Sequence, residues 1–353
     1  MSIQQPIAIL YQALPPPVIK GLRKEAKPGG YSDSGADIGF CLRERGLKLV
    51  TPVEDADPTR QMDWVFPDTA EGIENALARG AALLWANTVL FTGHPLEAVL
   101  NSAWIVGQTP AAQEAADDKF VTNALLRDAG LPVPASILVA PDARPGVHAL
   151  SALTDDVLEA AGLRFPLVVK PVRGRGSQGV SVVRDHASLV RAAEDLIASG
   201  RFGEDLIAEA FLSGAEMTVT VLPRKSGGYV ALPPVLRFDQ HDDVAPYNGL
   251  VAVTKNSRAL TPAEQAAPVV VAMMERCIKA AGLMGSRAAA RIDCREDENG
   301  VMALFDANLK PNLTGAGRPG RDDQDSLTMI AARALDWSYG DLLEEILRTA
   351  WRD

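Results

Sequence analysis

The sequence has 353 residues, of which 47% are hydrophobic and 23% are charged. These fractions are typical of a soluble globular protein, so the composition argues against a disordered chain, and the length allows two or three domains. The 35 basic and 45 acidic residues give a formal net charge of −10, which argues against a nucleic-acid partner because phosphate backbones attract basic surfaces.

The three cysteines are too few and too widely spaced for a disulfide framework or a zinc ribbon; they are Cys41, Cys277 and Cys294. The N-terminal residues lack the basic segment and apolar run of a signal peptide, and no apolar run approaches the roughly 20 residues of a membrane-spanning helix. We therefore expect a cytoplasmic protein without a membrane partner.

The N-terminal part of the chain alternates between predicted strands and helices. Strands are predicted at 6–12, 47–52 and 63–67 and helices at 35–45 and 69–80, whereas 82–90 fits either state. Asp33 or Ser34 is expected to cap the first helix. Such alternation is typical of a parallel sheet covered by helices, and we place this first domain at residues 1–112.

A second α/β unit is predicted at residues 113–208. It contains helices at 117–128 and 187–199, strands at 136–139, 165–171 and 180–183, and a loop at 141–154. The strand at 165–171 ends in Lys170 and Pro171, and a glycine-rich segment follows it.

The third unit is predicted at residues 209–353. Strands at 217–223 and 229–235 flank a hairpin, and strands at 286–294 and 301–307 flank an Asp-Glu-Asn-Gly turn. A long helical stretch at 263–282 contains Pro268, which either kinks it or starts a new helix. Closing helices are predicted at 325–337 and 339–350, and the polar residues 239–262 are a candidate lid.

The glycine loop, residues 173–179, is the most informative segment. Gly174, Gly176 and Gly179 match the G-x-G-x-x-G pattern of dinucleotide-binding proteins, but a strand follows instead of the helix which that pattern requires. A Walker A loop would end in Gly-Lys-Ser or Gly-Lys-Thr, and a protein kinase would place its lysine strand after the loop. We therefore interpret the loop as the tip of a hairpin.

Such a hairpin can lie over the phosphates of a nucleotide, because glycine lets backbone N–H groups approach phosphate oxygens. Lys170 precedes the loop, and Arg173 and Arg175 add positive charge. A plain surface hairpin with a solvated lysine is the alternative interpretation.

Two short acidic motifs indicate a metal site. In predicted strands, Arg291 and Asp293 share one face, as do Asp306 and Asn308. The turn between these strands would pair them and bring Asp293 close to Asp306 and Asn308. Two carboxylates and one amide oxygen suit Mg²⁺, which also takes water and phosphate oxygens. The alternative is a solvated polar face, but Asp and Asn are poor strand formers.

Several short motifs occur in a fixed order along the chain. They are Asp118-Lys119, Val168-Val-Lys-Pro171, the glycine loop, Glu209-Ala-Phe-Leu-Ser-Gly-Ala-Glu216, Arg291-Ile-Asp293 and Asp306-Ala-Asn308. Together they resemble the ATP-grasp superfamily and, within it, carboxylate–amine ligases of the D-alanine–D-alanine ligase type. The resemblance covers nearly the whole chain. It implies an α/β (α+β) fold, with an N-terminal Rossmann-like domain (1–112) before two ATP-grasp subdomains (113–208 and 209–353).

The resemblance also implies site residues, with ATP and one or two Mg²⁺ ions as cofactors. The phosphates would be bound by Lys119 and Lys170 and covered by Arg175, Gly176, Ser177 and Gln178. Adenine and ribose would be held by Glu209, Phe211, Leu212 and Glu216. Mg²⁺ would be bound by Asp293, Asp306 and Asn308. Arg291 would stabilise negative charge on the acyl phosphate and on the tetrahedral intermediate. The implied catalytic residues are Arg291, Lys170 and Ser177.

The chain departs from the D-alanine–D-alanine ligase pattern where amino acids are recognised. Asn312 stands where the family has glycine, and Gly317 stands near the position of a substrate-binding serine. Arg318 and Arg321 are additional basic residues that either bind a substrate carboxylate or remain solvated. The segment Gly29-Gly30-Tyr31-Ser32 lacks the glutamate that follows it in the family, the second histidine–glycine motif is absent, and His94 is expected to be structural.

We therefore predict an ATP-dependent ligase that joins a small-molecule carboxylate to an amine through an acyl phosphate, releasing ADP and phosphate. The alternatives are a true D-alanine–D-alanine ligase and a regulatory protein that binds ATP without turnover. A homodimer is an expectation taken from the resemblance.

Overall fold

The computed structural model describes residues 5–174, 176–240 and 253–353. The first sheet is parallel, as predicted, with the strand order β4-β1-β5-β6. Its strands are β1 (Ile7–Tyr11), β4 (Val65–Pro67), β5 (Leu83–Asn87) and β6 (Trp104–Val106), and its helices are α1 (Ser32–Glu44) and α2 (Ala70–Ala78). The ambiguous segment at 82–90 is thus a strand.

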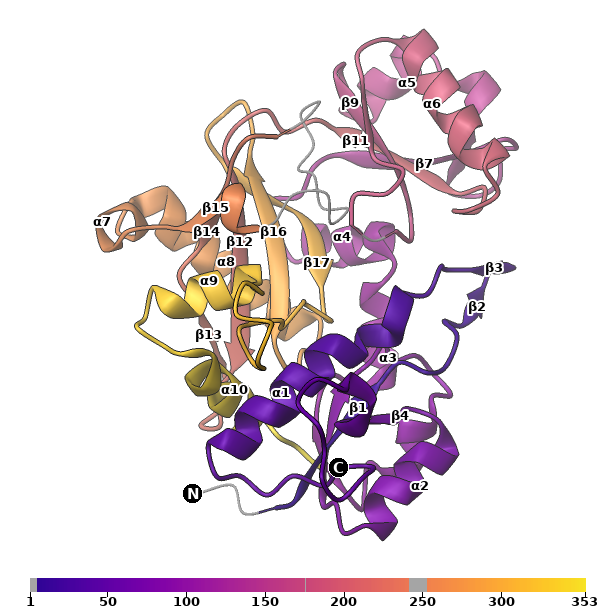
Figure 1. Ribbon diagram of the computed structural model, residues 1–353. Helices are drawn as coiled ribbons and strands as arrows, with labels where there is room; N and C mark the ends of the chain where they lie inside the picture. The colour runs from indigo at the N-terminus through magenta and orange to yellow at the C-terminus, as the bar shows by residue number, and fades with distance from the viewer. Residues whose placement is uncertain (1–4, 175, 241–252) are drawn as a thin grey trace.

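Two predictions for this region are wrong. The strand at 47–52 is reduced to one bridge between Leu49 and Ile7, because β4 pairs with this edge of β1 from Ile9 onward. Helix α1 is capped at Tyr31, whose φ of 66° is left-handed, so Asp33 and Ser34 lie inside the first turn. A small hairpin that was not predicted, β2 (Val18–Ile19) and β3 (Leu22–Arg23), projects from this domain (Figure 1).

The second sheet has the order β10-β9-β11-β7-β8. Its strands are β7 (Ser136–Ala140), β8 (Val147–Ala149), β9 (Leu167–Pro171), β10 (Ser181–Val183) and β11 (Leu206–Ala210), covered by α5 (Asp155–Ala160) and α6 (His186–Ala198). β8 falls within the predicted loop at 141–154. The predicted helix at 117–128 is confirmed as α4 (Lys119–Asp128), which the Asp118 side chain caps, and a further helix that was not predicted, α3 (Pro110–Ala116), precedes it.

The third sheet is antiparallel, with the order β15-β14-β12-β16-β17 and β13 paired to β12. Its strands are β12 (Glu216–Pro223), β13 (Tyr229–Ala231), β14 (Val235–Arg237), β15 (Ser257–Ala259), β16 (Ala290–Glu296) and β17 (Met302–Asn308). The helices of this part are α7 (Pro262–Gln265), α8 (Pro268–Leu283), α9 (Leu327–Arg333) and α10 (Tyr339–Leu347). Pro268 starts α8, a position where its missing N–H costs nothing.

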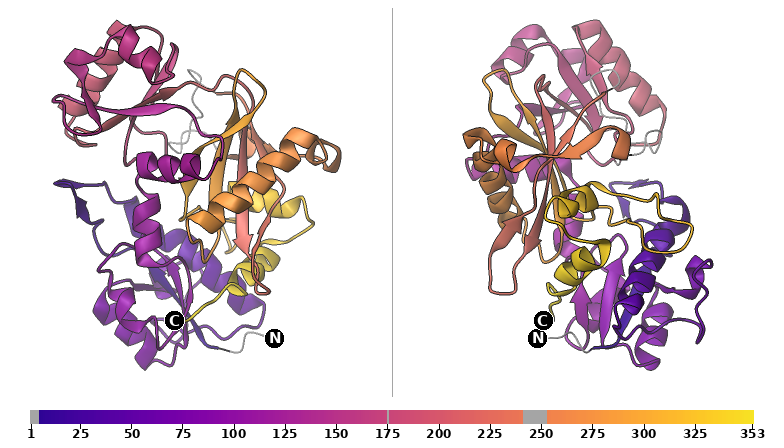
Figure 2. Two further views of the ribbon diagram at one scale, coloured as in Figure 1. Left: turned by 180° about the vertical axis from the view of Figure 1, so that it is seen from behind. Right: turned by 60° about the vertical axis from the view of Figure 1, so that its left-hand side comes forward.

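The hydrophobic cores join the first and third sheets and leave the second sheet apart. One core combines Ile9 and Ile38 of the first domain with Leu222, Leu343 and Ile346 of the third part. The buried residues of the second sheet form a core of their own. The left view in Figure 2 shows this sheet and its helices set off from the other two. Movement of the second sheet would therefore disturb little apolar packing.

The described residues contain no helix that is both long and apolar enough to cross a bilayer. Cys41, Cys277 and Cys294 are free thiols, and the Sγ atoms of the last two lie 3.5 Å apart in the core under β16.

Candidate active site

The two acidic motifs lie opposite each other on β16 and β17, as predicted. In the register of the two strands Asp293 faces Asp306, and Arg291 faces Asn308. Arg291 donates to both carboxylate oxygens of Asp293, at 3.1 and 3.0 Å, and Thr218 of β12 donates to one of them at 2.7 Å. One end of the third sheet thus presents a carboxylate pair beside a guanidinium group.

Two lysines approach this pair from other elements. Lys119, at the start of α4, donates to Asp306 Oδ1 at 2.7 Å. Lys170 of β9 donates to Glu209 Oε1 at 2.6 Å and to the Phe305 carbonyl at 3.3 Å, and its side chain is 5% exposed. Burial opposes ionisation of Asp306, but Lys119 and Lys170 outweigh burial and lower the pKa of this carboxyl. The two lysines therefore favour the charged form of Asp306.

A cavity of about 390 Å³ lies between the second and third sheets. Its lining includes the lysines and acidic residues above, the link residues Phe211 and Leu212, and Glu216. Gln240 donates to Glu216 Oε2 at 2.8 Å. We call this space the larger cavity. It brings together the predicted phosphate, adenine, ribose and metal residues, namely Lys119, Lys170, Gly176, Ser177, Gln178, Glu209, Phe211, Leu212, Glu216, Asp293, Asp306 and Asn308.

The glycine loop joins the antiparallel strands β9 and β10, which confirms the hairpin and excludes the dinucleotide fingerprint. Gly176, Ser177 and Gly179 all have positive φ values, of 59°, 57° and 71°. A Cβ at Gly179 would lie 2.8 Å from Leu196 Cδ2, so the tip tolerates only glycine there. Arg175 lies outside the described residues, as do residues 241–252 of the predicted lid at 239–262, although Val253 lines the larger cavity.

Glu209 offers a test of whether a nucleotide fits the larger cavity. Its Oε2 atom is buried and has no hydrogen-bond partner among the described residues, whereas Oε1 is bound to Lys170. Burial raises the pKa of this carboxyl, which Lys170 offsets in part. A buried acceptor without a donor is costly, so a ligand with an N–H donor at this position would be stabilised.

The donor set on β16 and β17 also fits Mg²⁺. No three His, Cys, Asp or Glu residues in the described parts of the chain form a cluster that would hold a metal by themselves. Asp293, Asp306 and Asn308 contribute only oxygen donors, and Mg²⁺ commonly completes such a partial set with water and the phosphates of its nucleotide. A nucleotide-bound Mg²⁺ therefore suits this wall better than a free ion.

A smaller cavity of about 160 Å³ lies next to the larger one. The two cavities share eight lining residues, which are Tyr31, Lys119, Gly174, Gly176, Arg291, Asp306, Asn308 and Lys310. The remaining wall of the smaller cavity comes mostly from the β2–β3 hairpin, the residues after β5 and the helix α3. The residues that follow β1 and β5 lie at the carboxyl ends of these strands. Parallel sheets commonly bind ligands at this end.

Tyr31 and Lys310 were not predicted as site residues. The Lys310 ammonium group lies 4.3 Å from the centre of the Tyr31 ring and donates to Asn87 at 2.9 Å, and Lys27 lies 4.5 Å from the same ring. Two left-handed glycines, Gly29 and Gly30, place Tyr31 there. Lys310 follows Asn308 by two residues, so the strand alternation that indicates Asp306 and Asn308 also indicates Lys310.

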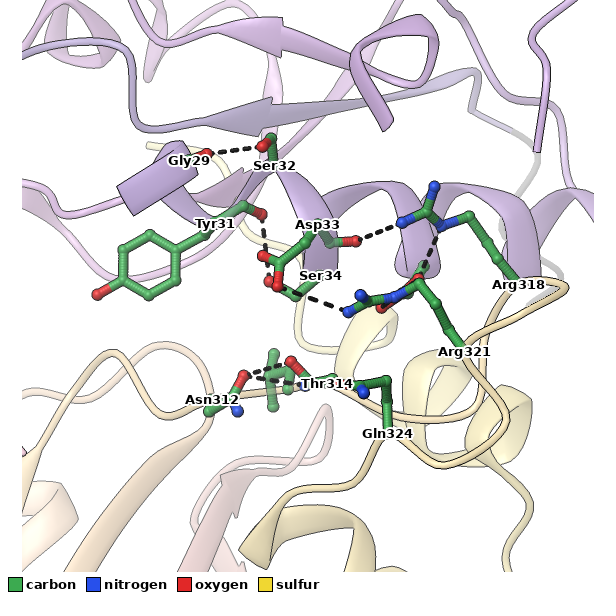
Figure 3. Close-up of polar contacts among 12 residues, drawn as sticks. Gly29, Tyr31, Ser32, Asp33, Ser34, Asn312, Thr314, Arg318, Arg321 and Gln324 are labelled. Atoms are coloured by element: carbon green, nitrogen blue, oxygen red, sulfur yellow. Dashed lines mark hydrogen bonds and ion pairs between the residues drawn. The ribbon is translucent and has the colours of Figure 1, made fainter. Parts of the chain in front are cut away.

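Three of the four predicted substrate residues do not line either cavity. Arg318 donates to Asp37 Oδ1 at 2.7 Å, and Arg321 donates to both Asp37 oxygens at 2.8 Å, so the expectation that they bind a substrate carboxylate is corrected. Figure 3 shows both arginines beside Asp33 at the start of α1, where Arg318 also donates to the Asp33 carbonyl at 3.3 Å. Gly317 packs so closely on Asp37 that a Cβ would lie 2.7 Å from it.

Asn312 does line the larger cavity, and its amide oxygen accepts from Thr314. Ser326 and Thr328 line it too, so the structure brings these two hydroxyl side chains, and not Gly317, to this wall. Ser326 lies 14 positions after Asn312, beyond a loop, so the motif around Asn312 does not indicate it.

His94 is structural, as expected. Its Nε2 lies 3.2 Å from Asp68 Oδ2, and both side chains are fully buried. Asp68 Oδ1 accepts from the backbone N–H groups of Ala13 and Leu14 at 2.9 and 2.8 Å. This carboxylate fixes the direction in which the chain leaves β1.

Comparison with known proteins decides the family. Residues 125–348 match the family described as "D-ala D-ala ligase C-terminus". The chain belongs to this family. Its relatives include an uncharacterized protein, y4sG, of Sinorhizobium fredii, 24% identical over 97% of this chain and 91% of that protein. A D-alanine–D-alanine ligase of Cupriavidus pinatubonensis is 31% identical, with 59% of each chain covered.

The D-alanine–D-alanine ligase fold is also evident from solved structures. The Bacillus anthracis D-alanine–D-alanine ligase complexed with ATP superposes with a TM-score of 0.66, at 17% identity, over 98% of this chain and 97% of that chain. This confirms the predicted ATP-grasp fold. Membership of the family confirms the predicted class, a carboxylate–amine ligase that uses ATP and Mg²⁺ and acts on small molecules.

Proposed function

We propose that this ligase binds ATP in the larger cavity and activates a carboxylic acid other than D-alanine for amide formation. The observation that carries the assignment of the site is the register of β16 and β17, which sets Asp293 against Asp306 beside Lys119 and Lys170. The unpartnered Oε2 atom of Glu209, whose other oxygen accepts from Lys170, supports an adenine amino group there.

In this proposal Lys119 and Lys170 bind ATP phosphates, and the glycine loop with Gly176, Ser177 and Gln178 covers the γ-phosphate. Phe211, Leu212, Glu209 and Glu216 hold the nucleoside. Asp293, Asp306 and Asn308 would hold Mg²⁺, which neutralises phosphate charge when bound. The role predicted for Arg175, which lies outside the described residues, stays a prediction.

The reaction requires two transfers. A carboxylate oxygen attacks the γ-phosphorus, the bond to the β-phosphate oxygen breaks, and ADP leaves. The amine nitrogen then attacks the acyl carbon, the bond to the phosphate oxygen breaks, and the nitrogen loses a proton as phosphate departs. Arg291 lies where the two cavities meet and would stabilise the negative charge of both steps.

The experiment is a screen for ADP release with Mg²⁺, ATP and paired pools of carboxylic acids and amines. We expect ADP only when both an acid and an amine are present, with amide as the second product. An Arg291→Ala variant should lose activity by about a hundredfold or more, as expected when a group that stabilises developing charge is removed. Nucleotide binding without ADP release from any pool would contradict the proposal and favour a regulatory protein.

A D-alanine–D-alanine ligase is the second candidate, because several relatives carry that name. The acidic residues that line the larger cavity, in the described parts of the chain, lie on β11, β12, β16 and β17, each near a basic partner. The wall around Tyr31, Asn312 and Ser326 thus adds no carboxylate for a substrate ammonium group. We expect little ADP release with D-alanine alone; release comparable to the best acid would establish this candidate.

We further propose a division into three domains with the last boundary moved from 208 to 210, because β11 continues to Ala210. The separate core of the second sheet supports this division. A cytoplasmic location and a homodimer remain proposals that come from the resemblance; sedimentation of the purified protein would test the dimer.

A further inference from the structure

The smaller cavity differs in chemistry from the larger one. Where it approaches the reaction centre it is lined by cations, among them Lys119, Arg291 and Lys310. Away from that end its lining is largely apolar, formed by Pro16, Pro17, Ile19, Leu22, Val89, Leu90, Phe91, Ala116 and Leu309. A ligand that matches this pattern has an anionic end and an apolar body.

The position of the cationic end indicates which substrate enters here. Gly174 and Gly176 of the glycine loop belong to the walls of both cavities, together with Asp306 and Asn308. A carboxylate at this junction would face the γ-phosphate that the loop is proposed to cover. The amine would then approach from the other end of the larger cavity, near Asn312 and Ser326.

The acidic groups of the smaller cavity are already engaged. Asp117 lies against Lys24 and accepts from Arg173 at 3.4 Å. Burial opposes its ionisation, but Lys24, Lys119 and Arg173 together lower the pKa of this carboxyl. Glu114 accepts from the backbone N–H of Thr92 at 2.7 Å. Neither carboxylate therefore requires a positive charge on the part of the substrate that occupies this cavity.

The β2–β3 hairpin forms a fixed wall of this cavity. Its turn residues, Lys20 and Gly21, have φ values of 51° and 78°, as in a tight two-residue hairpin. Ile19 and Leu22 pair across the hairpin, and both line the cavity. Leu22 also lies close to Gly203, in the loop before β11, where a Cβ would lie 3.6 Å from the Leu22 Cδ2 atom.

We infer that the smaller cavity binds the carboxylate substrate, and that this substrate is an acid with an apolar side chain larger than the methyl group of alanine. The inference rests on the proposed function, since it assigns a substrate to the same reaction. Ile19 and Leu22 would then determine which acids are accepted.

Hydroxylamine provides a test that does not require the natural amine, because it converts an acyl phosphate to a hydroxamate and releases phosphate. Hydroxamate formation is measured with Mg²⁺, ATP and a graded series, in both enantiomers, of alanine, valine, leucine and phenylalanine, and with the matching acids that lack the amino group. We expect kcat/KM to rise from alanine to the larger acids by about tenfold or more, the scale of selectivity that added methylene groups give in an apolar pocket.

Ile19→Phe fills the cavity, and Val18→Phe is the matched control, because Val18 adjoins it on the same strand but is 55% exposed and does not line the cavity. Ile19→Phe should remove the preference for large acids, because it should lower kcat/KM for these acids far more than kcat/KM for alanine. Leu22→Ala should extend the range to larger acids, and Val18→Phe should behave as the unaltered chain.

A preference for alanine, or the same effect of Ile19→Phe on every acid, would overturn the inference and leave the proposed function standing. Absence of hydroxamate with every acid would instead reject the proposed function. A melting temperature measured for each variant separates loss of fold from loss of selectivity.

Discussion

Lys119 and Asp306 lie 187 positions apart in the sequence, yet the lysine ammonium group donates to the carboxylate at 2.7 Å. The lysine begins the helix that precedes the second sheet, and the aspartate lies on the last strand of the third. This ion pair is where the predicted phosphate-binding group meets the predicted metal-binding group.

Lys119→Ala should lower kcat/KM for ATP by about a hundredfold, because it removes a preorganised positive charge from the phosphates. Steady-state ADP release at saturating acid and amine would measure this. Lys48→Ala is the control, since Lys48 is exposed and lines neither cavity. Equal activity of the two variants would remove Lys119 from the site.

Asp306→Asn should raise the Mg²⁺ concentration needed for half-maximal activity by about tenfold or more, because an amide offers a neutral ligand in place of a carboxylate. Titration of MgCl₂ at fixed ATP gives this value, and EDTA should abolish ADP release from the unaltered chain. Asp322→Asn, at an exposed position outside the cavities, should leave the titration unchanged. An unchanged Mg²⁺ requirement in Asp306→Asn would contradict the metal assignment.

Arg318→Ala should destabilise the fold without altering the KM for ATP. Asp37 is fully buried, and removing one of its arginine partners leaves buried charge poorly compensated, a loss on the order of 3 kcal/mol. Denaturant unfolding gives the free energy. The control is Arg348→Ala, whose surface pairs with Glu344 and Glu345 should contribute less than about 1 kcal/mol. A large change in KM with normal stability would restore Arg318 as a substrate residue.

The Glu264 carboxylate is expected to make the stability of the folded protein depend on pH. Its carboxylate accepts from both terminal nitrogens of Arg258 and from Thr261, and these contacts lower its pKa from 4.5 to about 2. A lowered pKa in the folded state means that the contribution to stability is complete above pH 4.5 and is lost as the pH falls toward 2.

Glu264→Gln should therefore lower the melting temperature at neutral pH, and the difference from the unaltered chain should shrink steadily below pH 4.5. Calorimetry at several pH values would show the trend. Glu298→Gln, in the exposed turn after β16, serves as the control. A difference that stays constant down to pH 3 would show that the Glu264 carboxylate is not the titrating group.

The strands that carry the chemistry could be predicted because their side chains alternate. Asp293, Asp306 and Asn308 are identifiable from a period of two, and the turn between the strands indicates their pairing. The glycine loop could be separated from a dinucleotide fold because a strand follows it. Local signals of this kind do not depend on the rest of the chain.

The rest of the site depends on contacts that no local pattern encodes. The sequence suggests Arg318 and Arg321 as substrate ligands. In the structure both bind Asp37 of α1, which precedes them by 281 and 284 positions in the sequence. Tyr31 reaches the reaction centre only because two glycines turn the chain left-handed before α1. The β2–β3 hairpin has two residues in each strand, too few to show an alternation.

The contacts of Asp68 have a consequence for how this chain can change. The segment leading to the β2–β3 hairpin is anchored by the hydrogen bonds from Ala13 and Leu14 to this carboxylate, and within the described parts of the chain the hairpin pairs with no other strand. Residues inserted into or deleted from the hairpin would thus leave the register of all three larger sheets unchanged. The hairpin is a place where the chain can evolve toward another acid while every residue proposed to contact ATP remains as it is.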